Sequence, residues 1–194
     1  GDSTRGLVNA EPVLMVTGHR RIHHPTLVVE RLLNVIDRLG PSRAISGGAA
    51  GADTLFAGAA ITAGVPLEIM LPNRWYTKRY PSAVNAAILS AAQRVTFVVD
   101  RPDRTDWRRS WDTQAWWRDN FVRNTAMLDA STHVVVVSGR HPAELVCERR
   151  GGTAGCLRSF AGRQPAGPLL WVPDDPDRAV RWVRFTPTRP AATS

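Results

Sequence analysis

The chain has 194 residues, of which 43% are hydrophobic, and this composition excludes an intrinsically disordered protein. No apolar run approaches the roughly 18 to 20 residues that a membrane helix needs, so we expect no membrane partner. The 25 Lys and Arg residues exceed the 17 Asp and Glu residues by 8. That excess favours anionic partners, and the scatter of the arginines favours a small anion over nucleic acid.

The chain alternates between strand and helix patterns. Short apolar runs rich in β-branched residues predict strands at residues 12–18, 43–46, 65–72, 94–100, 132–139 and 167–173. Helical periodicity or small-residue composition predicts helices at residues 26–40, 50–64, 82–92, 113–131 and 151–162. Strands of nearly continuous hydrophobicity that alternate with helices are typical of a parallel sheet covered on both faces. The predicted fold class is therefore α/β, a Rossmann-like, doubly wound, mostly parallel sheet.

The length fits one domain, which we place at residues 12–185 between a flexible leader (1–11) and a flexible tail (186–194). The leader lacks the apolar segment of a secretory signal, so we expect a cytoplasmic protein. Cys147 and Cys156 lie nine positions apart without a CxxC spacing, and His23 and His24 have no third ligand nearby. We therefore expect inert thiols, no metal and no cofactor.

In an open parallel sheet, ligands bind beyond the carboxyl ends of the strands, where helix N-termini present their amides. Several chemistry-bearing residues follow the predicted strands: Thr17, Gly18, His19, Arg20, Ser46, Gly47, Gly48, Gly51, Asp53, Gly151, Gly152 and Thr153. Gly47 and Gly48 are expected to allow positive φ and a close approach of main-chain amides to a phosphate or ribose. Gly151 and Gly152 repeat this device from another strand, so two helix N-termini are predicted to face one anion.

Two single residues have open alternatives. Asp53 lies in the first turn of its predicted helix, where it either caps free amides or accepts hydrogen bonds from ribose hydroxyls. Arg123 either binds a phosphate through its planar guanidinium or pairs with Asp119, four residues earlier.

The tryptophans allow two interpretations as well. The aromatic residues provide either a stacking surface for bases or packing at sheet edges and subunit contacts. They are Trp75, Tyr76, Trp107, Trp111, Trp116 and Trp117.

Five stretches, "VTGHR", "ISGGAAGAD", "PNRWYTKRYP", "FVRNTAMLDAS" and "GGTAGCLRSFA", occur in the order found in the SLOG superfamily. That superfamily includes the Lonely-Guy phosphoribohydrolases, the DNA-processing protein A fold and nucleotide sensors, and the resemblance extends over Val13 to Val172. It implies a Rossmann-like domain that binds a nucleotide or nucleotide-derived ligand. The matching positions are Gly18, His19, Arg20, Gly47, Gly48, Asp53, Arg123, Asn124, Gly151, Gly152 and Thr153.

One position departs from the Lonely-Guy pattern, because Cys156 stands where those enzymes have their catalytic Glu. Cleavage of an N-glycosidic bond needs a carboxylate, for which Asp53 or Glu148 would have to substitute. Our first hypothesis is therefore a binding or sensor domain for a nucleotide. The alternatives are an N-glycoside hydrolase of nucleoside 5′-monophosphates and a protein that binds single-stranded nucleic acid. A homo-oligomer is expected in each case.

Overall fold

The strands predicted at residues 12–18 and 132–139 lie side by side at the centre of one sheet in the computed structural model of the chain. The structure describes residues 11–76, 83–101, 113–164 and 168–184. Its strands are β1 (Val13–Gly18), β2 (Arg43–Ser46), β3 (Leu67–Leu71), β4 (Arg94–Phe97), β5 (His133–Ser138), β6 (Pro168–Pro173) and β7 (Arg181–Arg184). Its helices are α1 (Pro25–Leu39), α2 (Ala52–Thr62), α4 (Ala83–Ala91), α5 (Thr113–Ala130), α6 (Pro142–Leu145) and α7 (Gly152–Arg163).

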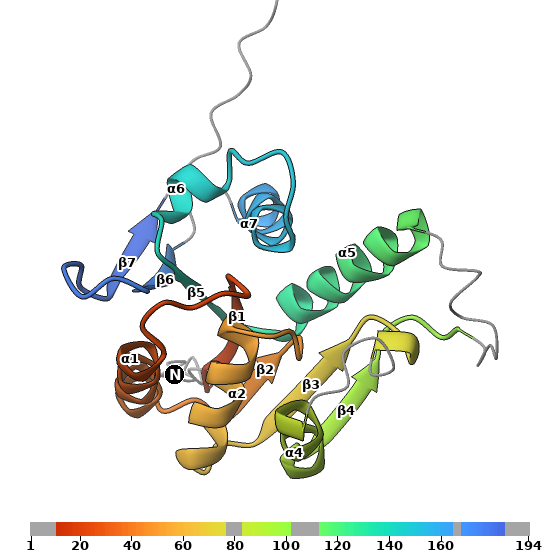
Figure 1. The fold of residues 1–194 in the computed structure, drawn as a ribbon, viewed down its shortest axis with the longest axis horizontal. Helices are drawn as coiled ribbons and strands as arrows, with labels where there is room; N and C mark the ends of the chain where they lie inside the picture. Colours follow the sequence, from red (N-terminus) through yellow and green to blue (C-terminus); the bar gives the residue numbers. More distant parts are fainter. Residues whose placement is uncertain (1–10, 77–82, 102–112, 165–167, 185–194) are drawn as a thin grey trace, which may run out of the picture.

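The seven strands have the order β4-β3-β2-β1-β5-β6-β7. All neighbouring pairs are parallel except β6 and β7. The order reverses at β1, so that β2 to β4 extend from one side of β1 and β5 to β7 from the other. Helices α1, α2 and α4 cover one face of the sheet, and α5 and α7 cover the other (Figure 1). The predicted α/β, Rossmann-like fold class is confirmed.

Each face of the sheet has its own apolar core. On the α1 and α2 side, Leu14 and Val16 of β1 pack against Leu32 and Phe56. On the α5 and α7 side, Met15 packs with Met127, Leu157 and Trp171. Alternate residues of one strand thus enter opposite cores, which explains why the central strands β1 and β5 are apolar along most of their length instead of alternating with polar residues.

The ends of the first helix have clear local causes. Pro25 occupies the first helical position, where a missing N–H costs nothing, and Gly40 ends the helix in the left-handed region with φ 54°. The Gly40 N–H donates to the carbonyl of Ile36 at 2.9 Å. In the described part of the chain, no helix combines the length and the apolar character required to cross a bilayer.

Two elements were not predicted. Helix α6 has four residues, too few to show helical periodicity. Strand β7 lies at the sheet edge and buries only Val183, so its sequence of two Arg and one Trp around that valine carries no apolar run.

Candidate functional site

The carboxyl end of β1 is the place where two loops from distant parts of the chain meet. The Ala52 amide at the start of α2 donates to the His19 carbonyl at 3.0 Å. The Thr153 hydroxyl in the first turn of α7 donates to the Gly18 carbonyl at 2.8 Å. Both helix N-termini therefore lie at the strand end where the sheet order reverses, which is the usual ligand position in this class of fold.

Gly18 is required by packing at this point. A Cβ on Gly18 would lie 2.2 Å from the carbonyl oxygen of Val137 and 2.7 Å from the Cβ of Ala52. Distances this short are excluded by sterics, so the close contact of β1, β5 and α2 depends on the absence of a side chain.

The turn between β2 and α2, residues 46–53, is held by its own polar groups. The Ser46 hydroxyl donates to the Asp53 carbonyl at 2.9 Å and accepts from the Gly48 amide at 3.2 Å. The Ala49 amide donates to Oδ2 of Asp53 at 3.1 Å. Gly48 and Gly51 have φ of 70° and 80°, which only glycine adopts without strain. The turn is thus a preformed structure whose polar groups largely satisfy one another.

Positive φ was also expected at Gly47, and that expectation is wrong. A Cβ on Gly47 would instead lie 2.5 Å from Nη1 of Arg123 and 2.8 Å from Oδ2 of Asp53. Glycine is needed at this position because the guanidinium group of Arg123 occupies the space of a side chain.

Arg123 is buried, with 7% of its surface exposed, and donates to neighbouring groups of the protein. Its Nη1 donates to the Gly47 carbonyl at 2.6 Å, and its Nε donates to Oδ1 of Asn124 at 2.9 Å. It does not pair with Asp119, which binds Arg101 and Asn73 instead. Arg123 therefore holds the 46–53 turn in position through Gly47, and Asn124 in turn orients Arg123. Neither of the two sequence interpretations included this role.

Asp53 combines burial with nearby positive charge. Only 8% of its surface is exposed. Burial raises the pKa of its carboxyl above 3.8, while the charge of Arg123, the Ala49 amide and the charge of Arg20 act in the opposite direction. The carboxyl accepts from the amide of Ala49, which is a capping role, although the capped amide belongs to the preceding turn and not to the helix of Asp53.

Cys156 lies under the same strand end as a protonated thiol. It is 1% exposed, and burial raises its pKa to about 11, against the opposing effects of a hydrogen bond with Thr17 and of the charge of Arg123. A thiol with this pKa is protonated at neutral pH and is a poor nucleophile.

The N-terminus of α7 differs from that of the other helices at this edge. Its first residues make no side-chain cap, contain no acid, and begin at Gly151 with φ 118°. Apart from chain neighbours and the backbone of the helix, no atom of the described residues lies within 4 Å of the position of a Cβ on Gly151 or on Gly152. By contrast, α1 begins under the carboxylate of Asp174, which accepts from the His23 and His24 amides at 2.6 and 2.7 Å. The open amides of α7 make it the more suitable end for an anion.

The role of Asp174 was missed because nothing local identifies it. It lies 151 and 150 residues from the two amides that it caps. Only the fold brings these residues together.

The remaining predicted residues lie at different places around this centre. Arg20 is close enough to Asp53 to lower the pKa of its carboxyl. Glu148 forms an ion pair with Arg140 on the surface, and this carboxylate contact, within the described ranges, is not with the 46–53 turn. No group of three His, Cys, Asp or Glu side chains in the described ranges could hold a metal ion.

The described aromatic residues differ in their exposure. Trp116 is buried and stacks on Tyr76 with ring centroids 5.4 Å apart, which is a packing role. Trp117 is 55% exposed. Trp107 and Trp111 lie outside the described residues.

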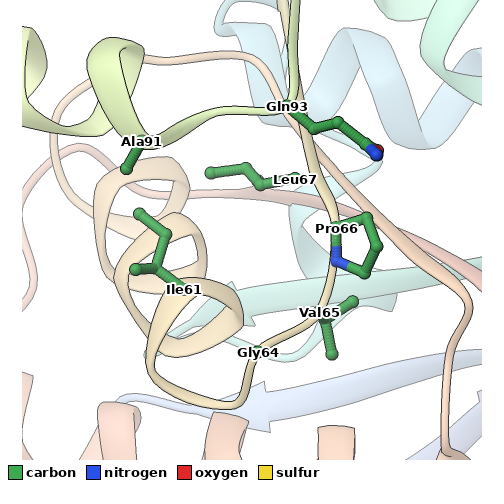
Figure 2. Close-up of a pocket in the computed structure, with 7 residues that line it drawn as sticks. All are labelled: Ile61, Gly64, Val65, Pro66, Leu67, Ala91 and Gln93. Carbon is green, nitrogen blue, oxygen red and sulfur yellow. The ribbon is translucent and has the colours of Figure 1, made fainter.

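A pocket of about 260 Å³ lies at the opposite edge of the sheet, where β3 begins (Figure 2). Ile61 from the end of α2 and Ala91 from the end of α4 line it together with Val65 and Leu67. It contains none of the predicted site residues and presents no charged group.

Sheet order, helix placement and the position of the site at the strand reversal define a Rossmann-like α/β domain. No protein family profile and no curated protein sequence matches the chain. Among solved structures, DNA processing protein A from Helicobacter pylori is similar with a TM-score of 0.58 and 15% sequence identity. The similarity covers 87% of this chain and 68% of that one, and that structure was described for its single-stranded DNA binding mode.

Two other solved structures show weaker similarity. DNA processing protein A from Streptococcus pneumoniae has a TM-score of 0.43 at 12% identity, covering 83% of this chain and 58% of that one. The molybdenum cofactor carrier protein from Chlamydomonas reinhardtii has a TM-score of 0.38 at 13% identity, covering 78% of this chain and 97% of that one. At these levels of identity, only the fold follows from the first similarity.

Proposed function

We propose that the protein binds a nucleotide or a nucleotide-derived ligand at the carboxyl end of β1. The phosphate lies at the N-terminus of α7, on the amides that follow Gly151. The sugar lies toward the 46–53 turn, where Asp53 is the nearest carboxylate able to accept from hydroxyl groups. The observation that carries this proposal is the meeting of both helix N-termini with Gly18 and His19.

The division of roles follows from which amides are already used. In the 46–53 turn, the amides of Gly48 and Ala49 donate within the turn itself. The first turn of α7 has no side-chain cap, and the exposed Arg149 and Arg150 precede it directly. A phosphate near α7 therefore gains amide donors and positive charge without displacing an existing hydrogen bond.

A charge reversal at Gly152 tests the placement. Gly152→Glu puts an acid into the first turn of α7, where it should leave stability equal or raise it by about 0.3–1 kcal/mol through the helix dipole. The same acid should repel a phosphate and weaken binding of nucleoside 5′-monophosphates by at least about tenfold in calorimetric titration. Gly152→Gln is the matched control of similar size without charge. Equal affinity of the Glu and Gln variants would contradict the placement.

Hydrolysis is the alternative fate of the same ligand. Cys156 is a protonated thiol, Glu148 is engaged with Arg140, and the carboxyl of Asp53 accepts from the Ala49 amide. We therefore expect the ligand to be bound and released unchanged. Incubation with the nucleoside monophosphates that bind, followed by chromatography for free base, decides between the two, since released base would establish the hydrolase.

One observation favours a second function, the binding of single-stranded nucleic acid. Trp117 and Phe121 are 55% and 57% exposed and lie one turn apart on α5, and the exposed Arg118 follows Trp117 directly. Aromatic rings beside arginine are the usual stacking surface for unpaired bases. The similar protein from Helicobacter pylori is described as binding single-stranded DNA.

Oligothymidylate binding tests this second function. Trp117→Ser should weaken binding, whereas Trp182→Ser, which removes a comparably exposed tryptophan from β7, should not. The affinity should also fall steeply with salt, because phosphate contacts release counterions. Equal binding by both variants would exclude the α5 surface.

A further inference from the structure

Three donor-bearing side chains lie around the indole ring of Trp171 on β6, and one of them, Arg181 on β7, is its register partner. The ring of His141 meets it edge-on with centroids 4.9 Å apart. The guanidinium carbons of Arg181 and Arg178 lie 5.3 and 5.6 Å from its centroid. The indole itself is fully buried, and its Nε1 donates to Ser138 at 3.1 Å. The three side chains therefore lie around an aromatic ring that burial and hydrogen bonding hold in one position.

The positive charge of this cluster is only partly balanced. Nε of Arg178 lies 3.4 Å from Oδ2 of Asp175. Within the described part of the chain, Arg181 has no carboxylate within ion-pair distance. A guanidinium group carries its N–H donors in its own plane. Two such groups around one ring repel each other, and a bound anion would offset that repulsion.

His141 adds a third donor. Its Nδ1 accepts a hydrogen bond from the Ala143 amide at 3.1 Å. A neutral imidazole that accepts at Nδ1 carries its proton on Nε2. Burial and the charges of Arg181 and Arg178 lower the pKa of His141 against the opposing charge of Glu144, which keeps the ring neutral and this tautomer in place. The cluster thus consists of groups that donate and of none that accepts from a ligand.

We propose that Arg178, Arg181 and His141 form a second binding site, one for a phosphate group, distinct from the N-terminus of α7. A phosphate offers several acceptor oxygens to a set of neighbouring donors, and guanidinium groups bind it with two parallel hydrogen bonds. The group belongs either to a free phosphate or to a second phosphate of a nucleotide bound near β1. This site goes beyond the proposed function, because it does not depend on what binds at α7.

The first test uses inorganic phosphate, with the His141 ring resonance in an NMR spectrum as readout. The resonance is assigned from its loss in His141→Asn, and ionic strength is held constant with chloride. We expect a saturable shift, with affinity about tenfold lower in Arg181→Gln and in Arg178→Gln because a charged hydrogen bond is lost. Arg38→Gln, an exposed arginine in the last turn of α1, is the matched control and should behave as wild type.

Two results would overturn the site: a shift that does not saturate, or unchanged affinity in both the Arg178 and Arg181 variants. The Trp171 indole resonance reports whether the Trp171 ring keeps its native environment in each variant. If Arg181→Gln displaces that resonance, Arg178→Gln decides, because residue 178 belongs to a loop and not to a strand.

The second test finds the source of the phosphate by comparing AMP with the dinucleotide pApA. If one ligand spans both sites, Arg181→Gln weakens pApA and leaves AMP unchanged. If the site takes a free phosphate, the variant leaves both nucleotides unchanged and still loses inorganic phosphate. A wild-type protein that binds inorganic phosphate but neither nucleotide supports this site and contradicts the proposed function, so the two failures are distinguishable.

Discussion

The guanidinium group of Arg123 occupies the space where Gly47 would carry a side chain. Its Nη1 donates to the Gly47 carbonyl at 2.6 Å, and it would lie 2.5 Å from a Cβ on that residue. A helix on one face of the sheet thereby fixes the turn after β2. The conformation of that turn depends on α5 as much as on its own glycines.

Replacing Gly47 with Ala should lower the free energy of unfolding by about 1–3 kcal/mol, because the methyl group overpacks the site. Urea denaturation provides the measurement. Gly58→Ala in the middle of α2 is the matched control, since no atom lies within 4 Å of its Cβ position. That control should gain roughly 0.5–1 kcal/mol from helix propensity. A Gly47→Ala variant as stable as wild type would show that Arg123 moves away without cost.

Removing the cap of α1 should also destabilise the fold. Asp174→Ala leaves the amides of His23 and His24 without their acceptor, at a cost of about 1–2 kcal/mol. Thermal unfolding compares it with Asp177→Ala, an exposed acid on the same loop that should change little. Equal melting temperatures of the two variants would contradict the capping role.

The raised pKa of Asp53 makes a prediction with a definite sign. The folded state holds the proton more tightly than the unfolded chain, so the contribution of Asp53 to stability is present below pH 3.8 and is lost as pH rises through its folded pKa. Asp53→Asn has no such titration. The unfolding free energy of wild type minus that of Asp53→Asn should therefore fall as pH rises from about 4 toward neutrality. A difference that rises with pH would mean that Arg123 dominates over burial.

The two cysteines should differ sharply in reactivity. Cys147 is exposed and Cys156 is buried with a pKa of about 11. A thiol reagent should label one cysteine of the native protein quickly and the second only in denaturant. The Cys147→Ser variant should show no rapid labelling. Fast labelling of that variant would mean that the strand end beneath α7 opens readily.

The regular parts of the fold were predictable because their signals are local. Strand β5 is a continuous apolar run buried in both cores, and α1 has apolar residues at helical spacing between Pro25 and Gly40. Strand β7 escaped prediction because its edge position buries one residue only.

The candidate site was predictable only in part. Its placement follows from strand order, and the positive φ of Gly48 from the turn chemistry of glycine. The reason for Gly47 is not in its neighbourhood, since Arg123 lies 76 residues away. Asp174 and the His23 amide that it caps lie about twice as far apart in the sequence. Contacts of this kind arise from the packing of whole elements, which no local pattern reports.

The central place of β1 has a consequence for how the chain assembles. One edge of β1 pairs with β2, which follows soon after it in the chain. The other edge pairs with β5, which is synthesised more than a hundred residues later. A fragment that ends after β4 would expose that unpaired edge to association with other chains. A fragment that starts at α5 would lack β1, the strand beside which β5 pairs. Both halves of the sheet therefore depend on β1, and we expect neither fragment to form its half of the sheet alone.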